Sequence, residues 1–227
     1  MRGHYHVLIS FLGPFSVIYP LYRLAMINEN VLIVMIIGIF LGSLVPDVDA
    51  SDAHILHGEL REIGLFFKYV IYNPVAYLAE RIFKIKKRHR GIMHSVLGIF
   101  LFQLILFSIL LIIEIIYSHY ESVSLHYLLM LNGYFFLAFT IGCILHIIED
   151  GYTISGVMPF LPKQIRLSGN IRTFSKKEDR FGGALIIVLG AIFIYAYITL
   201  EYITALLLTI ITYLASNIIA KKFFAER

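Results

Sequence analysis

The sequence contains no tryptophan, a single cysteine, Cys143, and only 15% charged residues. One cysteine excludes an intrachain disulfide, and so little charge cannot cover the surface of a water-soluble domain. Hydrophobic residues make up 59% of the 227 positions, and the mean hydropathy is +0.82. These values exclude a soluble globule, a disordered tail and a disulfide-stapled secreted module. They predict an integral membrane protein.

Six apolar segments approach the length of about 20 residues that a helix needs to cross the hydrocarbon core of a bilayer. They cover residues 7–27, 31–46, 92–117, 125–148, 183–200 and 202–220. We therefore predict an all-α helical bundle and treat residues 1–227 as a single membrane domain. Pro14 and Pro20 are expected to break the first segment. Only Glu201 separates the last two, so a single bent helix is an alternative there.

Two polar insertions interrupt this pattern, at about residues 47–91 and 151–181. Within the first, residues 65–83 are apolar but include Lys68, Asn73, Pro74, Glu80 and Arg81. This mixture predicts an amphipathic helix that lies on the membrane surface, and a re-entrant segment is the alternative.

The distribution of lysine and arginine predicts the orientation. If both termini are cytoplasmic, every Lys and Arg except Arg23 falls on the cytoplasmic side. Cationic loops stay on that side during insertion, so this arrangement is self-consistent. We predict a multi-pass cell-membrane protein with both ends in the cytoplasm.

Histidines and aspartates gather at the predicted cytoplasmic boundary, at the ends of four different segments. His146 and Asp150 are four positions apart, so on a helix they project from one side. A bundle of antiparallel helices would bring the four ends together. The residues concerned are His4, His6, Asp47, Asp49, His89, His94, His146 and Asp150.

Helix electrostatics point to a bound cation at this boundary. The aspartates follow the C-termini of predicted helices, where the helix dipole disfavours a carboxylate. His94 begins a helix, where the opposite field favours a neutral imidazole with a free lone pair. A divalent ion would stabilise such a group, and mixed His and Asp ligands suit Zn, Mn, Fe or Mg.

Each of these residues also has an ordinary explanation. Asp47 and Asp49 after a proline suit a turn, and an isolated buried histidine is more often hydrogen-bonded than metal-bound. The basic run at 84–90 is typical of contact with anionic lipid headgroups, and nucleic acid is not an expected partner. The metal interpretation gains weight because so many His and Asp residues share one boundary while the spans are nearly free of charge. His119 and His126 fall at the opposite boundary and receive no role.

Three ordered motifs connect the chain to a known family: PDVD at 46–49, HRGIMHS at 89–95 and HIIEDGYTISG at 146–156. Together they resemble the YdjM-type family of membrane-bound metal-dependent hydrolases, over about residues 3–162. Met93 departs from the Thr or Phe expected before the second histidine of the middle motif. His4 competes with His6 for the N-terminal place. The resemblance implies a metal centre formed by His6, Asp47, Asp49, His89, His94, His146 and Asp150.

The residues and the resemblance together favour a metal-dependent hydrolase with one or two divalent ions (Zn, Mn or Mg). Water activated by the metal would attack a phosphoester of a lipid or another amphiphile, so membrane lipid is the expected partner. His89 and Asp49 are the candidate catalytic residues, with His89 as general acid. Lys163, Arg166 and Arg172 are candidate phosphate-binding residues, although they equally suit a cytoplasmic loop.

Two other functions are compatible with the same residues. A metal-ion or small-solute transporter would use the cluster as a binding station, although the middle of the spans has few charged residues. A membrane scaffold would use it to hold a structural metal while its basic loops recruit a partner. Turnover of an ester or flux of a metal distinguishes these functions.

Overall fold

The computed structural model describes residues 1–50, 53–85 and 90–222, which are mostly helical with no strand among them. Six helices are long and apolar enough to cross a membrane, which confirms the predicted all-α bundle. The second of these spans consists of α2 and the 3-10 helix η1 (Val45–Asp49) that follows it. The six are α1 (Gly3–Arg23), α2 (Glu29–Leu44), α5 (Val96–Glu121), α6 (Leu125–Asp150), α7 (Lys176–Thr199) and α8 (Tyr202–Lys222).

The structure defines the course of the first helix and the junction between the last two. The break predicted at Pro14 and Pro20 was wrong, because α1 is continuous through both prolines. A proline removes one backbone bond, but the remaining bonds of an apolar helix have no water to compete with them. The last two segments are separate helices, since Leu200 adopts a left-handed backbone with φ 59° and ends α7.

Polar residues at the segment boundaries explain where three of the helices begin. Asn28 accepts a hydrogen bond from the amide of Val31 at the start of α2. Ser95 accepts one from Gly98 at the start of α5, and Ser175 caps α7 in the same way. A side-chain oxygen at this position satisfies an amide that has no partner inside the helix. The cap at Ser95 holds the start of α5 directly after His94.

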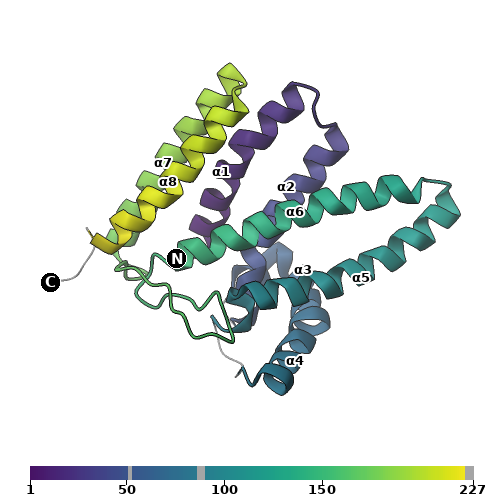
Figure 1. Cartoon of the computed structure of the whole chain (residues 1–227), viewed down its shortest axis with the longest axis horizontal. Coiled ribbons are helices and arrows are strands. Elements are labelled where there is room, and N and C mark those ends of the chain that lie inside the picture. Colours follow the sequence, from purple (N-terminus) through teal and green to yellow (C-terminus); the bar gives the residue numbers. More distant parts are fainter. Residues whose placement is uncertain (51–52, 86–89, 223–227) are drawn as a thin grey trace.

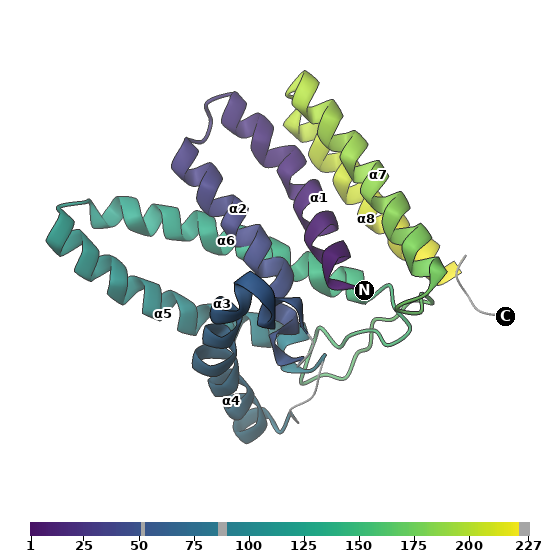
Figure 2. The same cartoon turned by 180° about the vertical axis from the view of Figure 1, so that it is seen from behind.

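The helices divide into two groups (Figures 1 and 2). Helices α1, α7 and α8 lie side by side, while the α5–α6 hairpin splays away from them. Helix α2 packs against both α1 and α6 and connects the two groups. The start of α1, the end of α6 and the end of α8 lie at one end of the molecule, as do both termini (Figure 1).

Glycines allow α2 and α6 to approach closely. A Cβ on Gly42 would lie 2.2 Å from the carbonyl oxygen of Phe139, and a Cβ on Gly142 would lie 2.5 Å from that of Ile39. Small residues at such positions let helix backbones pack directly against each other within a membrane. This contact fixes the end of α2 beside the last turns of α6.

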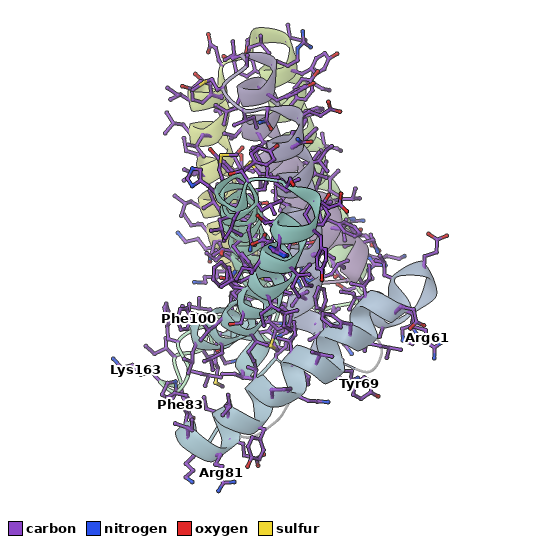
Figure 3. All side chains as sticks on the ribbon, turned by 90° about the vertical axis from the view of Figure 1, so that its right-hand side faces the viewer. Arg61, Tyr69, Arg81, Phe83, Phe100 and Lys163 are labelled. Atoms are coloured by element: carbon purple, nitrogen blue, oxygen red, sulfur yellow. The ribbon has the colours of Figure 1, made fainter. Side chains whose placement is uncertain are left out.

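A shorter helical segment crosses the end of the bundle, from Arg61 to beyond Arg81 (Figure 3). It consists of α3 (Arg61–Phe66), the π-helix η4 (Phe67–Tyr72) and α4 (Asn73–Phe83). One face packs on the core through residues such as Val75, while Tyr69 remains 63% exposed. The segment thus has the two-sided character predicted for residues 65–83. Its position on a membrane surface stays a prediction.

Candidate metal centre

Four side chains from three distant parts of the chain meet at the end of the bundle that holds both termini. Asp47 lies in η1, directly after α2, and His94 lies in the 3-10 helix η5 (Ile92–His94), directly before α5. His146 and Asp150 lie in the last turns of α6. One nitrogen or oxygen from each of the four lies within 4.8 Å of the others. This spacing allows all four to contact one metal ion.

The imidazole nitrogens face the carboxylates. His94 Nε2 lies 3.3 Å from Asp47 Oδ1 and 3.3 Å from Asp150 Oδ2. His146 Nε2 lies 3.5 Å from the same Asp47 oxygen and 3.9 Å from the same Asp150 oxygen. Each histidine therefore presents Nε2 to both acids.

The surroundings of His146 test whether these residues fit a metal. Its Nδ1 donates a hydrogen bond of 2.7 Å to the carbonyl oxygen of Ser43. The proton is then on Nδ1, and the lone pair of Nε2 is directed at the acids. Among the described residues, this buried Nε2 and the buried Oδ2 of Asp150 have no hydrogen-bond partner. A histidine ligand held by a carbonyl on its other nitrogen is the usual arrangement in metal sites, so the residues fit.

The buried carboxylate of Asp150 also lies where a negative charge is unfavourable unless a cation is close. Asp150 is 1% exposed at the C-terminus of α6, where the helix dipole disfavours an acid. Its Oδ1 accepts hydrogen bonds from Arg90 Nη2, at 2.7 Å, and from the amine of Met1. Its Oδ2 is left to face the two histidines. Cations thus already compensate one side of this carboxylate, and the other side is directed into the cluster.

The acids facing His94 favour a proton on its ring, in addition to the helix field considered from the sequence. Burial lowers the pKa of His94, but the close carboxylates of Asp150 and Asp47 outweigh burial and raise the pKa from 6.5 to about 9. A metal ion bound between them would replace the proton on His94.

His6 lies beside the four-residue group. Its ring stacks on His146 with centroids 3.9 Å apart. Its Nδ1 lies 2.8 Å from Glu149 Oε2, and its Nε2 lies 3.0 Å from the carbonyl oxygen of Met1 and 3.4 Å from Asp150 Oδ1. Both ring nitrogens therefore face oxygen acceptors. His4 is exposed and stacks obliquely on Tyr5 instead.

Two other predicted site residues are not in the group. Asp49 shares η1 with Asp47, but a 3-10 helix has three residues per turn, so side chains two positions apart point in different directions. Among the described residues Asp49 is not part of the group of four, and its charge, after burial, raises the pKa of Tyr72 to about 12. His89 lies outside the described residues. The ligand and catalytic roles assigned to both stay predictions.

A cavity of about 440 Å³ opens next to the cluster at Asp47, which is 24% exposed. His6, Arg2 and Arg90 also line it. The three cations predicted to bind phosphate are all exposed, and none of them lines this cavity within the described part of the chain. One of these, Arg166, donates instead to the carbonyl oxygens of residues 154 and 155.

Three contributors were not assigned by sequence reasoning. Arg90 contacts both Asp150 and Thr153, and its place between His89 and Gly91 in the middle motif was the available signal. Glu149 contacts His6 and Ser10, and its place in the third motif, directly before Asp150, was the available signal. The carbonyl of Ser43 carries no sequence signal, because every residue has a carbonyl group.

Fold and site together define a multi-pass helical membrane protein with a buried His and Asp cluster at one end, which could bind a metal ion. The chain belongs to the family described as YdjM inner membrane protein, which it matches over residues 1–224. The resemblance based on three motifs is thereby confirmed, and the match also includes α7 and α8. No curated protein and no solved structure matches the chain.

Proposed function

We propose that this protein is a membrane-embedded, metal-dependent hydrolase that cleaves a phosphoester of a lipid or another amphiphile. The proposal rests on two buried atoms that face each other, His146 Nε2 and Asp150 Oδ2. Among the described residues neither atom has a hydrogen-bond partner, and a cavity opens beside them at Asp47. A buried cluster of this kind costs folding free energy unless a cation compensates it. Its opening to a cavity is what a substrate requires and what a purely structural site does not.

The metal would be held by Asp47, His94, His146 and Asp150. Two imidazoles and two carboxylates suit Zn or Mn better than Mg, which prefers oxygen ligands and retains waters. A divalent ion there supplies a Lewis acid that polarises water and a phosphoryl oxygen. Residues 1–50, 53–85 and 90–222 contain one such group, which favours one ion.

The residues of the chain supply orientation and charge. Ser43 fixes the ring of His146, and Glu149 fixes the ring of His6. Arg90 lines the cavity and contacts Asp150, so its guanidinium lies where a phosphate next to the metal ligands would need a cation. We keep His89 as the proposed general acid and Asp49 as a second proposed catalytic residue. We also propose that this end of the bundle is cytoplasmic.

Loss of one ligand tests the proposal. We expect His146→Ala to lose bound metal and to lower turnover of phospholipid or generic phosphoesters in detergent by at least about 100-fold, since buried metal ligands tolerate no substitution. His126→Ala is the matched control, because His126 is exposed at the opposite end of the same helix. The proposal is overturned if the natural protein hydrolyses no ester, or if His146→Ala retains metal and turnover as fully as His126→Ala does.

A second variant examines substrate binding. Arg90→Lys keeps the charge but loses the planar geometry that contacts Asp150 and Thr153 together. We expect metal content to be unchanged and the KM for a phosphoester to rise. Stoichiometric metal without turnover of any ester, combined with metal flux into liposomes, would instead establish the transporter function.

A further inference from the structure

The metal-site cavity adjoins a second, apolar groove. The groove has a volume of about 330 Å³ and shares Gly3, His4 and Leu44 with the wall of the cavity. Its other lining residues are Val7, Leu8, Phe40 and Leu60. The polar cavity at Asp47 and Arg90 and the apolar groove therefore lie on either side of a shared wall.

The groove lies between two helices that are apolar enough to span a membrane. Val7 and Leu8 come from the second turn of α1, and Phe40 and Leu44 come from the last turns of α2. Leu8 is 45% exposed and thus forms part of the open side of the groove. A groove on the flank of spanning helices opens towards acyl chains, and its apolar walls cannot satisfy a polar ligand.

We propose that this groove admits one hydrocarbon chain of a membrane phospholipid while the phosphate headgroup enters the cavity beside Asp47 and Arg90. The inference rests on the proposed function, because it assigns the substrate class of the same site. A water-soluble phosphoester could fill the cavity alone but would leave the groove without a ligand. Only a molecule with a charged head and an apolar tail matches both parts of the space.

The position of the groove also defines the direction of entry. A lipid would pass sideways from the bilayer between the start of α1 and the end of α2, without leaving the membrane. His4 lies on the wall shared by both spaces and therefore borders the junction between head and tail. Carbons of the acyl chains beyond the groove would stay in the bilayer.

Tryptophan fluorescence tests the inference without requiring catalysis. The chain has no natural tryptophan, so an introduced one reports alone. We compare Phe40→Trp, in the groove, with Phe100→Trp, on the outer face of α5 and 59% exposed. Dibrominated phosphatidylglycerol is titrated into each protein in detergent. We expect quenching of Phe40→Trp to saturate at stoichiometric lipid and quenching of Phe100→Trp to increase only with the bulk lipid fraction.

A kinetic variant examines the same point. Leu8→Trp narrows the groove, and Leu104→Trp places the same side chain on α5 at a similarly exposed position. We expect Leu8→Trp to reduce kcat/KM for a long-chain phospholipid by roughly tenfold relative to a soluble phosphoester, since a few methylenes lose their contacts. Leu104→Trp should leave the ratio unchanged. An equal loss for both substrates would overturn the groove as a tail site.

The outcomes separate this inference from the proposed function. Saturable quenching without hydrolysis of any ester supports a lipid-binding groove and rejects the hydrolase. Hydrolysis of soluble phosphoesters with the same linear quenching in both tryptophan variants supports the hydrolase and rejects the groove.

Discussion

Asp47 and Asp49 are two positions apart, yet the 3-10 turn between them places them in different surroundings. Asp47 faces His94 and His146, whereas Asp49 lies near Tyr72. The motif resemblance treats the two acids as equivalent ligands. Among the described residues Asp47 belongs to the group of four that could hold a metal ion, and Asp49 does not.

Substitution of each aspartate separates their roles. We expect Asp47→Asn to lower the metal content from about one ion per chain to a small fraction of that, because an amide oxygen carries no charge to hold a divalent cation. Asp49→Asn should retain the metal. If Asp49 is catalytic, that variant loses turnover with its metal still bound. Metal content by mass spectrometry and turnover on the same samples provide the measurement, and loss of metal from Asp49→Asn alone would contradict the assignment.

At the scale of elements, the packing of α2 on α6 sets the geometry of the site. The carbonyl of Ser43, near the end of α2, fixes His146 on α6, and Asp47 follows four residues later. Gly42 and Gly142 allow this approach. The metal centre therefore depends on close packing of the two helices at glycines that carry no functional group.

A methyl group at this contact should disturb the site from a distance. Gly142→Ala places a Cβ against the carbonyl of Ile39, so α2 must move and Ser43 must move with it. We expect a loss of about 1–3 kcal/mol in the free energy of unfolding and a weaker affinity for the metal. Gly133→Ala, on the same helix, meets no atom within 4 Å and is the control.

Thermal unfolding in detergent and metal titration measure the two effects. The control should match or slightly exceed the natural protein, because alanine favours a helix over glycine. Equal metal affinity in both variants would mean that the α2–α6 contact does not position the ligands.

Across the whole molecule, six helices that are long and apolar enough to cross a membrane leave both termini at one end (Figure 1). The cluster lies at that same end, between the start of α1 and the end of α6. The orientation of this end is a separate question from the fold, and the basic loops predict that it is cytoplasmic.

Cysteine labelling determines the orientation. Cys143 is 1% exposed, so it should contribute little background. We expect a membrane-impermeant maleimide to label Ser122→Cys, between α5 and α6, in intact cells. Lys163→Cys, in the loop after α6, should react only after the cells are permeabilised. The reverse pattern would place the metal centre outside the cytoplasm.

Composition, apolar segment length and motif order were enough to predict six membrane helices, an all-α fold and the approximate position of a His and Asp cluster. These properties follow from transfer free energies and helix periodicity, which depend on residue type and spacing. Sequence spacing also paired His146 with Asp150, because both lie on one helix.

Other features depended on tertiary packing. The separation of Asp47 from Asp49, the place of His6 beside the cluster and the contact of Arg90 with Asp150 all involve residues that are distant in sequence or directions set by local backbone. The continuity of α1 through two prolines and the groove beside the cavity are of the same kind. Residue type and spacing are sufficient to predict which side chains reach one end of the bundle, but the directions in which their atoms point depend on how the helices pack.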